Sequence, residues 1–391
     1  MLHQSLPSWT YTSEEYFCLE AEVLFKRSWQ LVCHLNDIPD VGDYFTLPFL
    51  GQNIFVIKTK DGGVNGFHNV CRHRAARLLD GDQGNAKAGL VCPYHAWCYN
   101  LDGALTGVPR SHSLKDMDRS QYGLKPVEVE VWQGFIFIRM VNDGGPSVAE
   151  QFVECMRDIA PHQFENLQPL GRVTMRPRDV NWKQVADNYV DALHIPVAHP
   201  GLNSLFNGTY GVHIKGDVHI MYGDLETSVR DSVSGRAYKK FLPDGGHLPE
   251  SLKRKWIYFR MWPNLAFDVY PDQVDFMQFI PISATQTMIR EIPYALMDDR
   301  REMRAARYLN WRVNRQVNAE DTDLINRVQD GMASISYDQG PLSDEETLLI
   351  DSANRTRQQL PIVNEVVKPS RDTLLGLIEK EERYNKYGKS V

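Results

Sequence analysis

Several features that mark other classes of protein are missing from this chain of 391 residues. It has no run of 18 or more apolar residues, and the acidic N-terminus lacks a basic stretch followed by an apolar one. We therefore expect neither a membrane-spanning helix nor an export signal, and we predict a cytoplasmic protein. The chain also lacks any cluster of five lysines or arginines, and its formal net charge is -7. This charge argues against nucleic acid or an anionic membrane as a partner.

Cysteine is scarce, because only six cysteines occur in the whole chain. Six are too few for a scaffold held together by disulfides, so we expect buried thiols or metal ligands instead. With 42% hydrophobic and 24% charged residues the composition is that of a globular protein, and the length is typical of two domains.

Two of the cysteines are each followed closely by a histidine. The pairs are Cys71-Arg-His73 and Cys92-Pro-Tyr-His95, and 18 residues separate them. Two cysteines and two histidines can hold a structural zinc ion, but finger-type zinc sites usually pair cysteine with cysteine and histidine with histidine. A Rieske [2Fe-2S] cluster instead needs two thiolates on one iron and two imidazoles on the other. Because each pair supplies one ligand of each kind, the pattern favours the Rieske cluster.

A second candidate metal site follows near residue 190. Asp191 and His194 are three residues apart, which predicts that they share one face of a helix. Pro196 is expected to break that helix and to let His199 turn back toward His194. Two histidines and one carboxylate form the facial triad that binds Fe(II) and leaves positions open for dioxygen.

The third ligand of such a triad would be a carboxylate further along the chain. Asp321 falls into an apolar stripe at helical spacing, where a carboxylate is costly to bury unless it is paired or binds a metal. Alternatively, Asn318 caps a helix, and Glu320, Asp321 and Asp323 are acids favoured by its first turn. Glu320 and Asp323 are the other candidates for the ligand.

The motifs together resemble those of the Rieske non-haem iron oxygenases, in the catalytic (alpha) subunit of ring-hydroxylating type. The similarity rests on Asn-Val-Cys-Arg-His-Arg and Cys-Pro-Tyr-His-Ala-Trp within residues 69–103 and on Asp-Asn-Tyr-x-Asp-x-x-His-x4-His from residue 187. The first two motifs are similar to the branch that oxidises quaternary ammonium compounds. The resemblance implies an α+β protein, with an N-terminal all-β Rieske domain over residues 39–150. Residues 1–38 and 151–391 would form a helix-grip catalytic domain around an antiparallel sheet.

The resemblance also implies a role for each candidate residue. The ligands of the [2Fe-2S] cluster would be Cys71, His73, Cys92 and His95, and those of the mononuclear Fe(II) would be His194, His199 and Asp321. Asp191 would hydrogen-bond His194 and bridge to His95 of a neighbouring subunit, and Asn188 would lie near the iron. Trp97 and Tyr94 are expected to pack over the cluster.

Strand patterns support this organisation. We expect strands at 53–60 and 64–70, two more within 127–140 that are broken at Gln133-Gly134, and consecutive strands at 256–268, 273–281 and 285–293. Residues 256–279 carry eight aromatic side chains, some of which should face a cavity. The predicted substrate-binding residues are Leu202, Phe206, Tyr258 and Phe267.

The predicted function is that of a terminal oxygenase. The chain has no Gly-x-Gly-x-x-Gly segment for a flavin or nicotinamide, so its electrons would come from an NAD(P)H-dependent reductase, with or without a ferredoxin. Family architecture implies a homotrimer and O2 as co-substrate. We expect hydroxylation of a small aromatic substrate; the alternative is hydroxylation or oxidative N-demethylation of a quaternary ammonium compound. Two hypotheses from other classes of protein are a Rieske ferredoxin-like electron carrier and a protein with two zinc sites.

Overall fold

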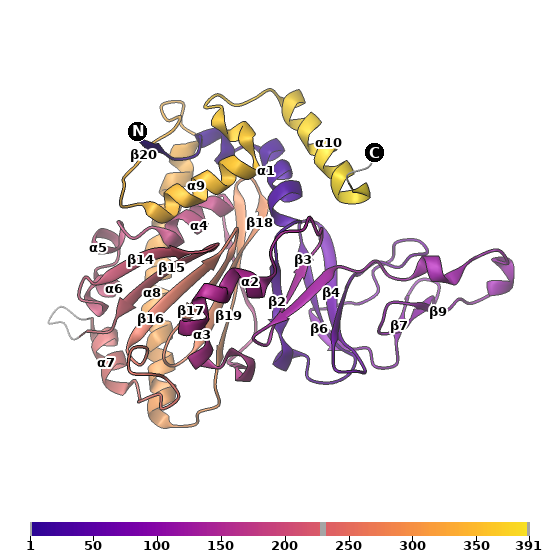
Figure 1. The fold of residues 1–391 in the computed structure, drawn as a ribbon, viewed down its shortest axis with the longest axis horizontal. Helices are drawn as coiled ribbons and strands as arrows, with labels where there is room; N and C mark the ends of the chain where they lie inside the picture. Colours follow the sequence, from indigo (N-terminus) through magenta and orange to yellow (C-terminus); the bar gives the residue numbers. More distant parts are fainter. Residues whose placement is uncertain (1, 227–231, 389–391) are drawn as a thin grey trace. The chain divides into compact units, whose positions relative to one another are not determined.

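The structure, a computed structural model, describes residues 2–226 and 232–388 (Figure 1). The chain divides into two compact units: a smaller unit of residues 27–148, and a larger unit of residues 1–26 and 149–391. Residues 27–38, which we expected in the catalytic part, lie in the smaller unit. They do so because β2 (Gln30–His34) hydrogen-bonds to β11 (Phe135–Arg139). Within the described residues, no helix is both long enough and apolar enough to cross a membrane.

The smaller unit consists of short antiparallel strands and 3-10 helices. Its other strands are β3 (Asp43–Phe49), β4 (Gln52–Lys58), β5 (Val64–His68), β6 (Gln83–Asn85), β7 (Leu90–Val91), β8 (Cys98–Tyr99), β9 (Leu105–Gly107) and β10 (Glu128–Trp132). They form three sheets, ordered β10-β11-β2, β5-β4-β3-β6 and β7-β8-β9. Its 3-10 helices are Leu35–Asp37, Ser111–Ser113 and Arg119–Tyr122. The strands expected at 53–60 and 64–70 and the two expected within 127–140 are confirmed, and they form the antiparallel pairs β4–β5 and β10–β11.

The larger unit is built on one antiparallel sheet of eight strands. The strands are β12 (Gln168–Pro169), β13 (Thr174–Arg178), β14 (Tyr210–Lys215), β15 (Val218–Asp224), β16 (Lys255–Met261), β17 (Leu265–Val269), β18 (Val274–Ser283) and β19 (Gln286–Ala295). Their order is β12-β19-β18-β17-β16-β15-β14, and β13 also pairs with β19. The single strand predicted at 256–268 is wrong. It is the hairpin β16–β17, because Pro263 has no N–H to continue a ladder and lies in the turn.

Helices cover both faces of this sheet. The helices of this part of the chain are α1 (Glu14–Glu20), α2 (Val148–Phe152), α3 (Met156–Ile159), α4 (Trp182–Val190), α5 (Ile195–Ala198), α6 (Pro200–Leu205), α7 (Val233–Phe241), α8 (Arg301–Met332), α9 (Thr347–Gln359) and α10 (Arg371–Tyr387). The larger unit also contains a π-helical turn (Ala21–Phe25) and the strand pair β1 (His3–Gln4) and β20 (Pro341–Leu342). Its 3-10 helices are Ser8–Tyr11, Val153–Cys155, Ala160–His162, Phe164–Asn166 and Pro361–Asn364. In Figure 1, α2 and α3 lie in front of the sheet, and α4 and α8 lie behind it.

The alternation of side chains along β16 and β17 decides which residues each helical layer meets. Phe259 and Phe267 are paired across the two strands, and both pack against Phe152 of α2. Their neighbours Tyr258 and Asp268, also paired, point to the opposite face, where α4 and α8 lie. The functional site is therefore expected on the face that carries Tyr258 and Asp268.

Helix α4 is anchored at its start. The side chain of the N-cap residue Asn181 accepts a hydrogen bond from the Lys183 N–H and donates one to the carbonyl of Ala284, after β18. The backbone N–H of Asn181 donates to Oε1 of Gln329 on α8 at 2.8 Å. These bonds hold α4 in a fixed position relative to both the sheet and α8.

A buried ion pair joins α4 to α1. Lys183 Nζ lies 2.8 Å from Glu20 Oε1, and Trp182 Nε1 donates to the other carboxylate oxygen. Burial lowers the pKa of Lys183 and raises that of Glu20, and their mutual attraction opposes both shifts. Each charge therefore depends on the other for its compensation in the interior.

Lys183→Met should destabilise the larger unit by about 3–5 kcal/mol, because it leaves the Glu20 carboxylate buried without its cation. The free energy of unfolding, measured by denaturant titration with tryptophan fluorescence, tests this. The control is Lys380→Met, at an exposed position on α10, which should change stability by less than about 0.5 kcal/mol. Equal stability of the two variants would contradict the role given to the buried pair.

Candidate functional site

Two loops of the smaller unit, residues 71–76 and 92–97, are conformational copies of each other. In the first, the Cys71 N–H donates to the Ala76 carbonyl and the Ala75 N–H to the Cys71 carbonyl. In the second, Cys92 donates to the carbonyl of residue 97, and residue 96 donates back to Cys92. The fourth residue after each cysteine is an alanine with positive φ, 58° and 55°. The two cysteine–histidine pairs are thus presented by matching loops.

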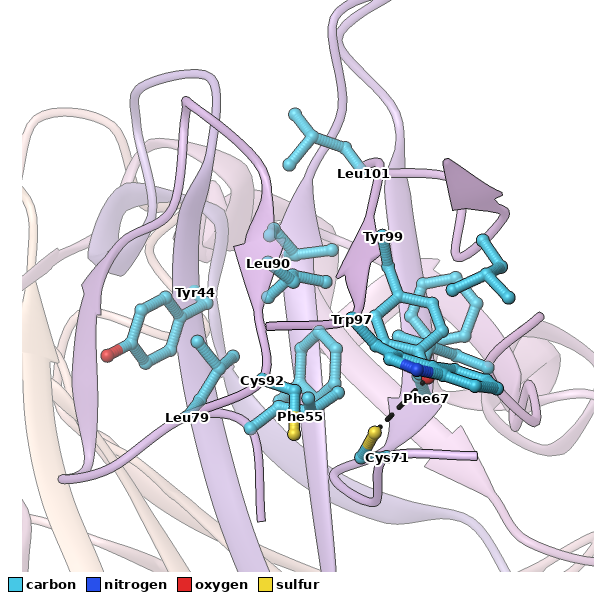
Figure 2. Close-up of a cluster of buried hydrophobic side chains, with 14 residues drawn as sticks. Tyr44, Phe55, Phe67, Cys71, Leu79, Leu90, Cys92, Trp97, Tyr99 and Leu101 are labelled. Carbon is cyan, nitrogen blue, oxygen red and sulfur yellow. Dashed lines mark hydrogen bonds between the residues drawn. The ribbon is translucent and has the colours of Figure 1, made fainter. Parts of the chain in front are cut away.

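The side chains of these loops suit a buried cluster with one exposed edge. Cys71 and Cys92 are buried in a hydrophobic cluster with Trp97 and Tyr99, and Figure 2 shows both sulfur atoms among these side chains. The Tyr99 hydroxyl lies 3.4 Å from the Cys71 sulfur. Burial raises the pKa of the Cys71 thiol, so a positively charged metal is the natural stabiliser of its thiolate.

The two histidines lie together at the edge of the same cluster. The rings of His73 and His95 have centroids 4.6 Å apart, and Trp97 stacks on His73 at 4.8 Å. Tyr94 lies over His95 and is itself exposed. Within the described part of the chain, Nδ1 of His95 is buried and has no hydrogen-bond partner. Two buried thiols and an unpartnered imidazole nitrogen fit a [2Fe-2S] cluster with mixed ligands.

In the larger unit, His194, His199 and Asp321 bring one ligand atom each within 4.8 Å of the others. Nε2 of His199 lies 3.1 Å from Nε2 of His194 and 2.8 Å from Oδ1 of Asp321, and the third distance is 3.5 Å. A divalent metal lies about 2.1 Å from an imidazole nitrogen, so ligands at right angles stand about 3 Å apart. The three atoms therefore match one face of an octahedral iron site.

The local path of the chain at this site differs from the expectation. Helix α4 ends at Val190, so Asp191 and His194 do not share a helix face. Oδ1 of Asp191 accepts the Leu193 N–H at 2.8 Å and so stabilises a turn in place of the helix. Pro196 does not interrupt a helix either: it lies in the first turn of α5, where its missing N–H costs nothing.

Asp321 comes from the middle of α8, which begins twenty residues earlier at Arg301. The alternative in which Asn318 caps a helix that begins there is therefore wrong. The Asn188 side chain donates to Oδ1 of Asp321 at 3.1 Å. Burial would raise the pKa of Asp321, but hydrogen bonds from His194 and His199 lower it to about 2, so the carboxylate is ionised.

Two further carboxylates orient the imidazoles. Nδ1 of His194 donates to Asp191 Oδ2 at 3.0 Å, and Nδ1 of His199 donates to Glu320 Oε2 at 2.7 Å. Both bonds leave Nε2 directed at Asp321, as a metal ligand requires. The sequence analysis missed this role of Glu320, which it considered either as a metal ligand or as an acid in the first turn of a helix. The sequence feature that could have indicated this role is the position of Glu320 directly before Asp321.

A cavity of about 90 Å³, here called the inner cavity, adjoins these three side chains. Leu202 and Tyr258 line it, but Phe206 and Phe267 do not. Phe206 packs on Trp256, with centroids 5.8 Å apart, and Phe267 points to the other face of the sheet. The further lining residues are Asn188, Tyr189, Asp191, Ile195, Tyr210, Asp268, Asp275, Met277, Glu291, Asn314, Val317 and Asn318.

The inner cavity is acidic as well as aromatic. Asp268 on β17 lies directly opposite Asp275 on β18, an arrangement that is unfavourable for two carboxylates unless a cation compensates it. Asp268 accepts hydrogen bonds from Tyr189 at 2.5 Å and from Tyr270 at 3.2 Å. Among the described residues, no lysine or arginine lines this cavity. The sequence analysis missed Asp268; its signal was a lone acid in the apolar strand Leu265–Val269.

Two models of known protein domains match this chain. Residues 28–118 match the Rieske [2Fe-2S] domain, and residues 164–361 match the ring hydroxylating alpha subunit (catalytic domain). The carnitine monooxygenase oxygenase subunit of Acinetobacter baumannii is 31% identical over 85% of this chain and 86% of its own length. The chloroplastic choline monooxygenase of Spinacia oleracea is 29% identical over 85% of this chain and 73% of its own.

A solved structure extends the similarity to the fold. The quaternary ammonium Rieske monooxygenase CntA in complex with L-carnitine has a TM-score of 0.75 and 25% identity, over 92% of this chain and 96% of that one. Fold and site define the class, an oxygenase that contains a Rieske [2Fe-2S] cluster and a mononuclear iron and uses O2. The chain belongs to the Rieske non-haem iron oxygenases, as a catalytic subunit of the ring-hydroxylating alpha type. It is a terminal oxygenase; such enzymes take electrons from a reductase and form multimers.

His199→Ala should remove the mononuclear iron and leave the cluster, because the two ligand sets lie in separate units of the chain. Cys92→Ser should do the reverse. Iron and acid-labile sulfide content, together with the visible spectrum, report each site separately. Loss of sulfide and colour from His199→Ala would show that the two sets of ligands are wrongly assigned.

Proposed function

We propose that this oxygenase acts on a quaternary ammonium compound, by hydroxylation or oxidative N-demethylation. The observation that carries the proposal is Asp268, a buried carboxylate without a cationic side chain beside it, in a cavity that also contains the rings of Tyr189, Tyr210 and Tyr258. The ring centroids of Tyr189 and Tyr210 lie 6.4 and 6.2 Å from that of Tyr258. A cation within about 6 Å of such rings is attracted to their faces.

The same lining argues against the aromatic substrate that the sequence analysis placed first. An uncharged ring would leave Asp268 and Asp275 facing an apolar surface, and burying polar groups in this way costs free energy. A trimethylammonium group would instead neutralise the carboxylates and present its methyl groups to the tyrosine rings. The relatives named for carnitine and choline support this choice.

We assign the cofactors to the residues as follows. The cluster ligands are Cys71, His73, Cys92 and His95, and the mononuclear iron ligands are His194, His199 and Asp321. The bound cofactors supply one-electron transfer and dioxygen activation. The chain holds the ligand imidazoles through Asp191 and Glu320, and the inner cavity places the substrate beside Asp321.

We also infer a homotrimer in which Asp191 bridges to His95 of a neighbouring subunit. Leu193 and Val197, close to Asp191 in the sequence, are exposed apolar side chains, which suits a surface that another subunit covers. A cytoplasmic location and an NAD(P)H-dependent reductase, with or without a ferredoxin, stay predictions.

The substrate class is tested with chemically reduced protein, labelled dioxygen and a panel of quaternary ammonium and aromatic compounds. Mass spectrometry should find label in products of a quaternary ammonium compound, or formaldehyde where a methyl group is removed. Label in an aromatic product and in no quaternary ammonium product would contradict the proposal.

The binding of tetramethylammonium should depend on pH through Asp268. Burial raises the pKa of this carboxyl to about 7, so it is neutral below that pH and charged above it. Titration calorimetry should therefore show binding that tightens about tenfold between about pH 6 and about pH 8. Asp268→Asn should weaken this dependence, of which Asp275 keeps a part because burial also raises the pKa of its carboxyl, and Asp224→Asn, on β15 outside the cavity, should keep it in full. The same pH profile in Asp268→Asn would contradict the assignment.

Asp191→Asn should keep both metals and slow electron transfer, because it alters the bridge and not a ligand. Stopped-flow absorption of the reduced protein with O2 and substrate should show cluster reoxidation that is about 10–100-fold slower. The matched control is Asp323→Asn, an exposed carboxylate paired with Arg327 on the surface of α8. Reoxidation at the normal rate in Asp191→Asn would overturn the bridging role.

A further inference from the structure

A second cavity, here called the outer cavity, adjoins the inner one. It has a volume of about 860 Å³ and is lined by β12, β13, β19 and α8. Four residues line both cavities: Asp275, Glu291, Asn314 and Asn318. The two cavities therefore share a boundary formed by β18, β19 and the helix that carries Asp321.

The two cavities differ in charge. Five arginines line the outer cavity: Arg172, Arg176, Arg304, Arg307 and Arg315. Of its four carboxylates, Glu291 is paired with Arg176 and Asp298 with Arg300. Within residues 2–226 and 232–388, Arg172 and Arg304 form no ion pair. A molecule that spans both cavities thus meets carboxylates at its inner end and guanidinium groups at its outer end.

Arg176 lies at the boundary between the acidic inner cavity and the arginine-rich outer cavity. It extends from β13 and bonds Glu291, which lines both cavities, through Nη2. Its Nε is buried and, among the described atoms, has no hydrogen-bond partner. A guanidinium group carries five donors in a planar fork, and the Arg176 side chain is 27% exposed, so Arg176 can bind Glu291 through Nη2 and still present other donors to a second carboxylate.

We propose that Arg176 binds a carboxylate of the substrate, and that the substrate is therefore a zwitterion whose quaternary ammonium group enters the inner cavity. This inference rests on the proposed function and narrows it to compounds with both charges. The opposite charges of the two cavities orient such a molecule with its cation toward Asp268 and its carboxylate toward the arginines. A cation without a carboxylate would use only the inner half of this arrangement.

The experiment is titration calorimetry of the metal-loaded protein with matched pairs of probes. Each pair is a trimethylammonium carboxylate with one, two or three methylene groups and the alkyltrimethylammonium of the same length. For at least one spacer length, the wild-type protein should bind the zwitterion at least tenfold more tightly than its partner. Arg176→Gln should reduce this ratio to less than about twofold and leave the binding of the simple cation unchanged or tighter.

Arg178→Gln is the matched control. Arg178 lies two residues further along β13 but lines neither cavity, so its replacement should keep the ratio. The double variant Arg176→Gln with Glu291→Gln removes the carboxylate that the single variant would leave unpaired, and it should also lack the preference. A double variant that regains the preference would show that Arg176 serves only to neutralise Glu291, and would overturn the inference.

The outcomes separate this inference from the proposed function. Simple cations that bind as tightly as the zwitterions at every spacer length would contradict the inference alone. Failure of the wild-type protein to bind any quaternary ammonium probe would contradict the proposed function, and the inference with it.

Discussion

The arrangement of the larger unit depends on one constraint: three atoms that we propose as metal ligands, from distant parts of the chain, lie within 4.8 Å of one another. His194 and His199 come from the segment after α4, whereas Asp321 comes from the middle of α8. The two helices are held together at the other end of α4, where Asn181 bonds Gln329 on α8. The buried Glu20–Lys183 pair fixes α4 from its other side. The metal site is thus supported by rigid elements, which preorganises its ligands.

In the smaller unit, loops and not helices hold the proposed ligands in place. The proposed cluster ligands come from two loops of matching conformation that are closed by their own backbone hydrogen bonds. Cys71 and Cys92 point into an apolar cluster, and His73 and His95 lie at its edge with the exposed ring of Tyr94. This polarity suits a cluster that is protected from water on the thiolate side and accessible to electron transfer on the imidazole side.

Charged side chains, as well as shape, distinguish the proposed substrate pocket. The sheet register places Asp268 opposite Asp275, and Glu291 is balanced by Arg176. A permanent cation bound in the inner cavity, as we propose, would compensate Asp268 and Asp275. Further from the metal site the same wall becomes rich in arginine, so selectivity among cationic substrates is expected to depend on what else the molecule carries.

The sequence by itself determined the metal chemistry and most of the strands. The cysteine–histidine pairs and the two histidines around Pro196 are local patterns, and local spacing is enough to recognise them. The sequence did not determine which side of β17 faces the cavity. Alternation along a strand has a period of two, but it does not say which of the two sets of side chains faces the cavity. Phe267 was therefore predicted to bind substrate, whereas its neighbour Asp268 lines the cavity. Only the tertiary structure decided that Asp321 lies within 2.8 Å of His199 and that Arg176 meets Glu291. Both contacts join segments more than 100 residues apart, and their formation depends on packing across the sheet and α8, which no local periodicity encodes.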